Sequence, residues 1–391
     1  MKICFAICEY NPLHNGHLIH INKIKEEVKP DCLAIIMSGN FTQRGEIALL
    51  DKYTRASHAI KAGADVVFEL PTVFATGNAE IFAKGAVSLA NTLTGSHVLC
   101  FGTESGAKDT LLTTAKMLIA ESKEFKALYK EELKTGVTSI KAKVNALSKM
   151  NIENVDCELL KSPNNILGIE YTKAILNFKS KLDIHPIIRE GAGYNDTELY
   201  KGISSASAIR NAILEGKIKK TKSSLPDFVY KDLPKTLPNA NDLIFYSILK
   251  ASKQELKEII DCTEGLENRI KALSKTSINL EDLKDKLKTK RYTYTRISRI
   301  LLSSMLGIDE NFIRKCLSSE LYLKVLAVNK QRINLLSELT QLTDTPIITR
   351  KSDADKLIGI AKSCFEKDVF ANDVYGFVTK NKTNEYDMKM I

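Results

Sequence analysis

The sequence predicts an α/β protein in which a doubly wound parallel sheet fills the first half of the chain. The first observation is a series of short apolar runs that recur about every thirty residues, at 2–8, 32–39, 65–71 and 97–102. Runs without polar alternation are typical of parallel strands buried on both faces. The second observation is a series of helical patterns between these runs, at 17–27, 52–62 and 79–93. Strand and helix in alternation indicate βαβ units.

Residues 107–150 interrupt the alternation with a Lys- and Ala-rich helical pattern. We expect this segment to be a helical insertion that caps one edge of the sheet. The strand pattern returns at 181–190, and after a loop a helical run at 203–216 ends at Gly216, a residue type common just after helices. These elements complete the predicted sheet domain.

A domain boundary is predicted at 217–240, where Lys, Ser and Pro are concentrated. We expect one domain at 1–220 and a second, basic and mainly helical, at 221–391. Helical patterns follow one another after the boundary. The last piece, which contains YLKVLAVNK and TPIITR, has the pattern of a small α/β arrangement.

The positive charge of the chain lies in its second half. Residues 1–200 hold 23 basic and 23 acidic side chains, whereas residues 201–391 hold 34 and 24, which is the whole net charge of +10. A neutral half joined to a basic half suggests a catalytic or small-ligand unit tethered to a surface that meets a polyanion. On charge alone, lysines that merely solubilise helices remain an alternative.

Composition argues against export, membrane insertion and a resident metal site. No apolar stretch approaches the roughly 20 residues of a membrane-spanning helix. The apolar run from Ile3 to Cys8 is too short for a signal peptide, so a cytoplasmic location is expected. The eight cysteines are scattered without a CxxC pair or a His-Cys cluster, and we interpret them as buried thiols.

The string NPLHNGH follows the first predicted strand and contains two of the six histidines. Ligands of a doubly wound sheet bind at the carboxyl ends of its strands, where the next helix offers free N–H groups to an anion. His14 and His17 are three residues apart, so both rings can reach one phosphate from the first helical turn. Gly16 lets a base or ribose approach the backbone, Pro12 stiffens the turn, and Asn11 can bond backbone or phosphate. An isolated HxxH pair more often has a capping or surface role.

A second motif, ISSASAIR at 203–210, precedes a helical pattern late in the same predicted domain. Ser204 and Ser205 stand just before the helix, where hydroxyl and N–H groups can bind the β- and γ-phosphates of a nucleotide. Arg210 lies one turn further on and can pair with phosphate. Simple N-capping is the alternative, and it is compatible with phosphate binding.

The two strings resemble the HxGH and ISSTxIR signatures of the nucleotidyltransferase superfamily, whose members share a Rossmann-like fold and transfer or generate adenylates from ATP. Ala206, followed by Ser207, stands where the second signature has Thr. Six strings narrow the resemblance: EYNPLHNGH, SGNFTQRGE, FELPTVFA, FGTESG, SPNNILGIEY and IREGAGYND. They are similar, over nearly the whole chain, to the bacterial tRNA(Met) cytidine acetate ligase family.

The resemblance implies an enzyme that converts acetate and ATP to acetyl-AMP and pyrophosphate, then passes the acetyl group to N4 of the wobble cytidine of elongator tRNA(Met). It implies ATP with Mg²⁺ as substrate and no tightly bound cofactor. The implied catalytic residues are His14, His17 and Ser205. The implied ATP-binding residues are Ile7, Cys8, Glu9, Tyr10, Asn11, Pro12, Leu13, His14, Asn15, Gly16, His17, Leu18, Ile19, His20, Gly102, Asn164, Arg189, Ser204 and Arg210.

For three of these positions, the residue type and its predicted place in the fold favour nucleotide binding without the resemblance. Gly102 ends a predicted strand at the ligand edge, where a side chain would obstruct a nucleotide. Asn164 offers a donor and an acceptor to base or ribose, although a helix N-cap after Pro163 is the alternative. Arg189 ends a strand beside a glycine-rich loop and can pair with phosphate, with a surface salt bridge as the alternative.

The basic stretch KDKLKTKRYTYTRISR at 284–299 is the candidate surface for the tRNA. It holds seven Lys or Arg with two interleaved Tyr, a composition suited to phosphates and unpaired bases. The predicted contacts are Lys288, Lys290, Arg291, Arg296 and Arg299. On composition alone, a solvated helix face is the alternative.

Two other functions stay open from the sequence. One is a small-molecule adenylyltransferase of the same superfamily, which would leave the basic half unexplained. The other is an RNA-binding protein that senses ATP without chemistry. The intact His14, Gly16 and His17 argue against it.

Overall fold

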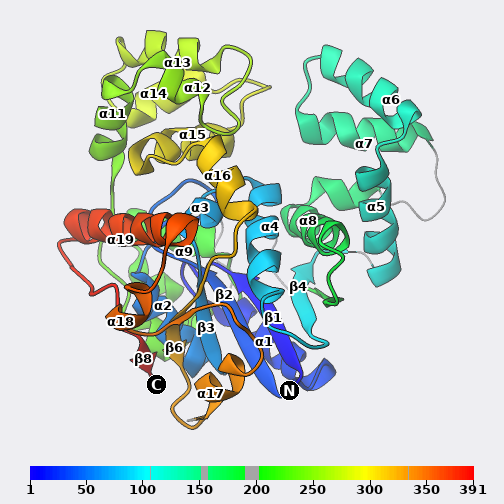
Figure 1. Cartoon of the computed structure of the whole chain (residues 1–391). Helices are drawn as coiled ribbons and strands as arrows, with labels where there is room; N and C mark the ends of the chain where they lie inside the picture. Colours follow the sequence, from blue (N-terminus) through cyan, green and yellow to red (C-terminus); the bar gives the residue numbers. More distant parts are fainter. Residues whose placement is uncertain (106, 151–156, 190–201, 333) are drawn as a thin grey trace.

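The computed structural model describes residues 1–105, 107–150, 157–189, 202–332 and 334–391 (Figure 1). Its centre is a sheet in the order β5-β4-β1-β2-β3-β6-β7, with β8 paired to β6. The first five strands are β1 (Ile3–Cys8), β2 (Cys32–Ser38), β3 (Val66–Leu70), β4 (Val98–Thr103) and β5 (Asp183–Ile188). All five are parallel, so the predicted strands and their direction are confirmed.

The strand order reverses next to β1. From β1 the chain builds outward through β2 and β3, and then returns to place β4 and β5 on the other side of β1. Such a reversal leaves a crevice at the carboxyl ends of the strands, where ligands of doubly wound sheets bind. The fold therefore offers a binding site immediately after β1, where NPLHNGH lies.

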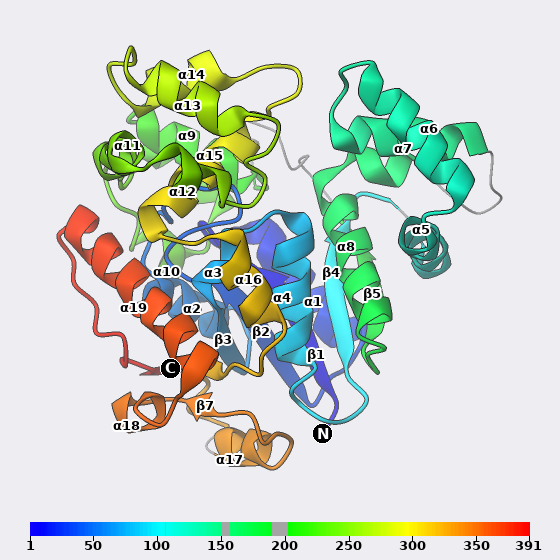
Figure 2. The ribbon, with the colours of Figure 1, turned by 45° about the horizontal axis from the view of Figure 1, so that its top comes forward.

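Helices cover both faces of the sheet because alternate strand residues point to opposite sides. Ile3 and Phe5 belong to one core cluster, whereas Cys4 and Ala6 belong to another. The helices of the first face include α3 (Thr72–Ala75), α4 (Ala79–Ala90) and α8 (Pro163–Asn177). Those of the second face include α1 (Asn15–Glu27), α2 (Lys52–Lys61) and α9 (Ala206–Leu214). Figure 2 shows the two layers on either side of the strands.

The predicted insertion is helical throughout its described part. It comprises α5 (Lys108–Ala120), α6 (Lys123–Lys134) and α7 (Ser139–Met150). A short 3₁₀ helix (Cys157–Lys161) then leads to α8. Helices α6 and α7 pack on each other, beyond the carboxyl ends of the parallel strands (Figure 1).

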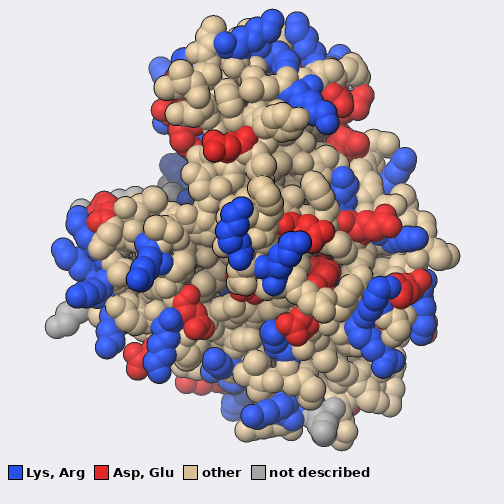
Figure 3. Space-filling view, turned by 90° about the vertical axis from the view of Figure 1, so that its left-hand side faces the viewer, with Lys and Arg blue, Asp and Glu red and all other residues tan. Residues whose placement is uncertain are grey.

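A helical bundle follows the predicted boundary, which contains a 3₁₀ helix (Ile218–Ser224) and α10 (Asp227–Tyr230). The bundle comprises α11 (Asn241–Lys250), α12 (Lys253–Lys257), α13 (Leu266–Ser274), α14 (Leu280–Leu287) and α15 (Tyr294–Leu306), and α16 (Glu310–Leu317) connects it to the sheet. Like the insertion, it lies beyond the carboxyl ends of the strands (Figures 1 and 2). Lys and Arg side chains gather at its outer end (Figure 3).

The last part of the chain has the predicted α/β character but does not form a sheet of its own. Strand β6 (Leu323–Val328) pairs antiparallel with β3, and β7 (Ile347–Ile348) and β8 (Lys389–Met390) pair with β6. Every residue of β6 is buried, so β6 covers the edge that β3 would otherwise expose. The helices here are α17 (Leu335–Thr340), α18 (Lys351–Ala354) and α19 (Gly359–Thr379). The sheet therefore takes strands from both sides of residue 220, and the predicted boundary cuts through it.

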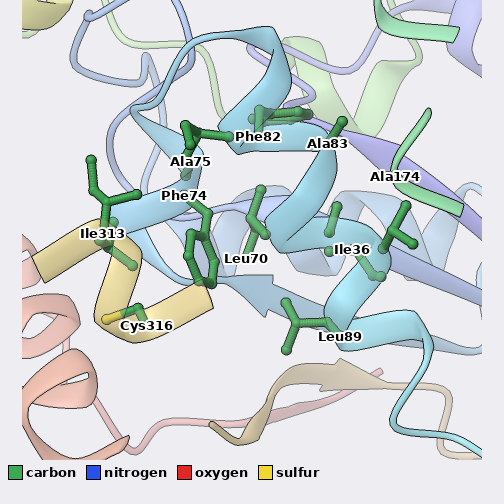
Figure 4. Close-up of a cluster of buried hydrophobic side chains, with 14 of the residues drawn as sticks. Ile36, Leu70, Phe74, Ala75, Phe82, Ala83, Leu89, Ala174, Ile313 and Cys316 are labelled. Atoms are coloured by element: carbon green, nitrogen blue, oxygen red, sulfur yellow. The ribbon is translucent and has the colours of Figure 1, made fainter. Parts of the chain in front are cut away.

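The main hydrophobic core also spans both halves of the sequence. Ile36 and Phe82 lie in it together with Ile313 and Cys316 of α16 (Figure 4). Phe74 fills the space between these groups and is fully buried (Figure 4). Of the cysteines that the structure describes, all are free thiols and all but Cys8 are buried, as predicted.

A buried ionic cluster ties α2, β3, β6 and the C-terminal segment together. The Lys52 Nζ atom lies 2.9 Å from Glu69 and 2.7 Å from Glu385. Lys324 lies 2.9 Å from Glu69 and also pairs with Glu385. Asp368 of α19 is buried nearby, and burial together with the charge of Glu69 raises its pKa to about 7. No local sequence pattern pointed to this cluster.

Candidate active site

The two histidines of NPLHNGH form a reciprocal cap at the start of α1. His14 is the N-cap residue, and its Nδ1 accepts a hydrogen bond of 3.1 Å from the Gly16 N–H. The Nδ1 of His17 accepts one of 3.2 Å from the His14 N–H. The rings stack with their centroids 3.7 Å apart. A Cβ at Gly16 would lie 3.0 Å from the His14 ring, so this glycine also makes room for the cap.

The same hydrogen bonds fix the proton positions of both rings. A ring nitrogen that accepts a hydrogen bond carries no proton, so each neutral imidazole holds its proton on Nε2. Burial and the charge of Arg189 lower the pKa of His14 to about 3. Burial, assisted by the neighbouring His14 and Arg189, also lowers the pKa of His17. At neutral pH the pair therefore presents two uncharged N–H donors, which suit an anionic ligand.

The second motif begins α9 beside the first. Ser205 is the N-cap residue, and its hydroxyl accepts a hydrogen bond of 3.0 Å from the Ala208 N–H. Ser204 is buried, and its hydroxyl lies 2.9 Å from that of Ser224. The capping geometry leaves the first N–H groups of α9 at the same sheet edge as those of α1. Two helix N-termini therefore meet where an anion would bind.

Direct hydrogen bonds hold the two motifs together. The Asn15 side chain donates to the Gly202 carbonyl at 2.9 Å and to the Ser223 carbonyl at 3.0 Å. Arg210 donates to the Asn11 carbonyl at 2.8 Å. These contacts join segments almost two hundred residues apart and fix the distance between the two helix starts.

A cavity that is open to solvent lies where the motifs meet. The predicted residues that line it are Ile7, Cys8, Glu9, Tyr10, Asn11, His14, Gly16, His17, His20, Gly102, Asn164, Arg189, Ser205 and Arg210. Ile19 and Ser204 line a smaller adjoining cavity, which shares His14, Gly16 and Arg189 with the first.

Four of the predicted ATP-binding residues do not line either cavity. They are Pro12, Leu13, Asn15 and Leu18. Leu13 is fully buried and packs, together with Leu18, in the core cluster below α1. Asn15 uses its side chain in the link between the motifs. Pro12 is buried in the turn between β1 and α1. Their role in the described structure is to shape the loop rather than to line the site.

Gly102, Asn164 and Arg189 meet at the far wall of the cavity. A Cβ at Gly102 would lie 3.0 Å from the Arg189 Cγ. The absence of a side chain at Gly102 therefore leaves room for the Arg189 side chain. The Asn164 side chain donates to Glu104 at 2.6 Å. Asn164 is not the N-cap of α8, because Ser162 holds that position and Pro163 begins the helix. The alternative of a capping role is therefore wrong.

The sequence-based assignment missed two parts of the wall. One is the loop after β2, whose Thr42, Gln43, Arg44 and Glu46 line the cavity. The sequence did contain a signal for this loop. The string SGNFTQRGE directly follows a buried strand, so it lies at the edge of the sheet where ligands bind. The other part is an apolar wall on helices and β4, formed by Phe82, Phe101, Leu167 and Tyr171. Nothing in the local pattern distinguishes these from core residues.

The same loop touches the helical bundle on its outer side. Gly45 has φ +76°, and a Cβ there would lie 2.5 Å from the Arg299 backbone nitrogen and from the Ser298 carbonyl carbon. The loop is therefore a thin partition. The cavity lies on one side of it and α15 on the other.

The predicted tRNA contacts fall into two groups. Lys288 and Lys290 are exposed at the end of α14 and in the loop that follows. The three arginines have partners within the bundle, which are Glu264 for Arg291, the Asp261 carbonyl at 2.6 Å for Arg296, and the Asp261 carboxylate at 3.6 Å for Arg299.

Within the described residues, no group of three or more His, Cys, Asp or Glu side chains could hold a metal ion. In the same part of the chain, no helix combines the length and apolar composition needed to cross a bilayer.

A doubly wound sheet with an HxGH pair at the start of its first crossover helix defines a nucleotidyltransferase. The family model described as HIGH Nucleotidyl Transferase matches residues 1–389. A tRNA(Met) cytidine acetate ligase of Thermosipho melanesiensis is 40% identical, with 96% of this chain and 94% of the relative covered. Its counterpart in Caldanaerobacter subterraneus is 39% identical, with 97% and 96% covered. The chain belongs to the tRNA(Met) cytidine acetate ligase family.

Solved structures agree over the full length. The apo crystal structure of Thermotoga maritima TmcAL has a TM-score of 0.92 and 30% identity, with both chains covered completely. A second crystal structure of that protein, bound with alpha-thio ATP, has a TM-score of 0.89 at the same identity and coverage. The predicted fold and family are therefore confirmed.

Proposed function

We propose that the chain uses ATP to activate acetate and then acetylates N4 of the wobble cytidine of elongator tRNA(Met). The observation that carries this function is the cavity in which two helix N-termini and two neutral histidine donors converge. Full-length similarity to tRNA(Met) cytidine acetate ligases supports the acceptor. The alpha-thio ATP bound to the Thermotoga maritima relative supports the nucleotide.

In the first step an acetate oxygen attacks the α-phosphorus of ATP. A bond from acetate oxygen to phosphorus forms, the bond from that phosphorus to the bridging oxygen breaks, and pyrophosphate leaves with the bonding electrons. His14 and His17 donate from Nε2 to the phosphate oxygens, and Ser205 orients the N–H groups at the start of α9. Arg189 and Arg210 add positive charge. The residues act by positioning and electrostatic stabilisation, without a covalent enzyme intermediate.

Mg²⁺ enters this scheme with ATP. When bound with ATP, Mg²⁺ would take most of its ligands from the phosphates and water, as is usual in nucleotide sites. In the second step N4 of cytidine attacks the acetyl carbon, and AMP leaves with the electrons of the broken bond.

The helical bundle is the proposed binding surface for the tRNA. The exposed Lys288 and Lys290 are placed to meet phosphates. Arg291, Arg296 and Arg299 contribute charge from positions fixed by their acidic or carbonyl partners. A cytoplasmic location, where tRNA is found, follows from this substrate.

The experiment that tests the function follows both products. The chain is incubated with ATP, acetate and Mg²⁺, and pyrophosphate release and N4-acetylcytidine are measured with and without elongator tRNA(Met). A transcript with uridine in place of the wobble cytidine is the control. Acetylcytidine in the native tRNA alone supports the proposal. AMP transfer to a mononucleotide or to phosphopantetheine would instead indicate a small-molecule adenylyltransferase, and ATP binding without pyrophosphate release would indicate a sensor.

A further inference from the structure

Transfer of the acetyl group to cytidine, taken here from the proposed function, requires an acceptor for one proton. The lone pair of the exocyclic N4 is delocalised into the base, so N4 is a poor nucleophile. When the bond from N4 to the acetyl carbon forms, the bond from that carbon to the AMP oxygen breaks and N4 must lose a proton. A positioned general base contributes about 10²- to 10⁴-fold to such a step.

The histidines of the cavity are unsuited to accept this proton. The Nδ1 atoms of His14 and His17 already accept backbone N–H groups, so their Nε2 atoms carry hydrogen and act as donors. His20 also lines the cavity. Its burial and the charge of Arg189 lower its pKa to about 4, which disfavours uptake of a proton at neutral pH.

The other titratable groups that line the cavity differ sharply in their readiness to take up a proton. Burial raises the pKa values of Cys8 and Tyr10, so both are already protonated. The Glu46 side chain is 46% exposed and is already paired with Arg210 at 3.4 Å. Among the described residues that line the cavity, the remaining carboxylate is Glu9.

Glu9 is held rigidly at the end of β1. Its Oε1 accepts a hydrogen bond of 2.7 Å from the Gln43 N–H. Its backbone carbonyl accepts one of 2.6 Å from Arg55, a fully buried side chain that also donates to the Ser38 carbonyl at 3.1 Å. Arg55 thereby joins the ends of β1 and β2. The carboxylate has a fixed position at the ligand edge, as proton transfer requires.

Burial and the neighbouring charges act on the Glu9 carboxylate in opposite directions. Burial raises its pKa above the ordinary value, and the Gln43 N–H and the positive charge of Arg210 oppose that effect. Glu46 adds to the rise, and Arg44 opposes it. A raised pKa makes a carboxylate a stronger base, so burial at this position favours proton transfer to Glu9.

We infer that Glu9 is the general base of the acetyl-transfer step. Its carboxylate accepts the N4 proton as the bond to the acetyl carbon forms. AMP departs with the electrons of the broken C–O bond, and the carboxylic acid then releases the proton to solvent. The first step, attack by acetate on ATP, involves no such proton. The role of Glu9 as a base therefore applies to acetyl transfer and not to adenylate formation.

Measuring the half-reactions one at a time tests this assignment. Acetate-dependent exchange of pyrophosphate into ATP reports adenylate formation, and single-turnover transfer from synthetic acetyl-AMP to elongator tRNA(Met) reports acetyl transfer. Glu9→Gln retains an oxygen for the Gln43 N–H. We expect it to slow transfer by about 10²- to 10⁴-fold, with a much smaller effect on exchange. Glu9→Asp, which keeps a carboxylate, is expected to recover part of the transfer rate.

Two further measurements decide the outcome. In the unmodified chain the transfer rate should rise with pH until a carboxyl group above its ordinary pKa has ionised, and Glu9→Gln should lack this rise; this profile also serves if the variant folds poorly. Equal losses in both half-reactions, no loss in transfer, or a larger transfer loss in Glu46→Gln would overturn the assignment. Absence of transfer by the unmodified chain would instead contradict the proposed function, and this inference with it.

Discussion

Substitutions of His17 test the roles of its two ring nitrogens separately. The Nδ1 atom caps α1 through the His14 N–H, whereas Nε2 carries the proton proposed to meet the phosphates. His17→Ala removes both contacts. Loss of the cap costs about 1 kcal/mol of folding free energy, a small part of the 5–15 kcal/mol typical of a domain. Loss of one preorganised donor lowers turnover by about 10²- to 10³-fold, or about 3–4 kcal/mol in the transition state.

Two further variants test whether the loss of stability comes from Nδ1 and the loss of turnover from Nε2. His17→Asn keeps an oxygen near the position of Nδ1 and has no group that reaches as far as Nε2. We expect it to retain stability but lose turnover as His17→Ala does. His17→Gln places an amide near the Nε2 position, so we expect it to recover part of the turnover without the cap.

The assay is acetate-dependent exchange of pyrophosphate into ATP, with urea unfolding for stability and filter binding for tRNA affinity. All three variants should bind elongator tRNA(Met) as the unmodified chain does, because His17 lies in the nucleotide cavity and not in the bundle. Turnover of His17→Ala within about 3-fold of normal would refute the assigned role. Equal activity of the Asn and Gln variants would refute the division between the two nitrogens.

The remaining predictions concern the ionic cluster and the bundle. Lys324→Met should lower the free energy of unfolding in urea by about 3–5 kcal/mol, because it leaves excess negative charge buried; a loss below about 1 kcal/mol would contradict this. The raised pKa of Asp368, about 7 against about 3.9 in an unfolded chain, adds stability that is full below pH 4 and lost as pH rises to 7. Asp368→Asn should therefore abolish a decline of up to about 4 kcal/mol in urea titrations across that range. Lys288→Ala with Lys290→Ala should weaken tRNA binding and reduce its salt dependence by up to two phosphate contacts, whereas Lys330→Ala, at the opposite edge of the sheet, should not.

The parallel strands and the two motifs were predictable because their signals are local. Strands buried on both faces have continuous apolar runs, and the ligand edge follows from the direction of the strands. The helix starts at Asn15 and Ala206 lie within a few residues of the predicted ones. The meeting of the motifs could be expected because both precede helices at the same sheet edge.

The remainder depends on contacts between distant residues. The apolar run of β6 identifies a strand, but nothing within it indicates that Phe68 pairs with Val325. The ionic cluster likewise combines Lys52 with Glu385, more than three hundred residues away. The charge of Arg299 is included in the composition, but the composition does not indicate that Arg299 pairs with Asp261. Pairings across such distances leave no periodic signal in either segment.

The partition at Gly45 is the point where a wall of the cavity touches the helical bundle. The loop residues around it form a wall of the cavity, while Gly45 itself lies against the backbone of α15. If the bundle binds the tRNA as proposed, a single layer of main chain separates the bundle from the acetyl-adenylate whose acetyl carbon N4 attacks. A side chain at Gly45 would clash with the Ser298 and Arg299 backbone, so any substitution there would move the loop and α15 apart and change the spacing between the cavity and the bundle.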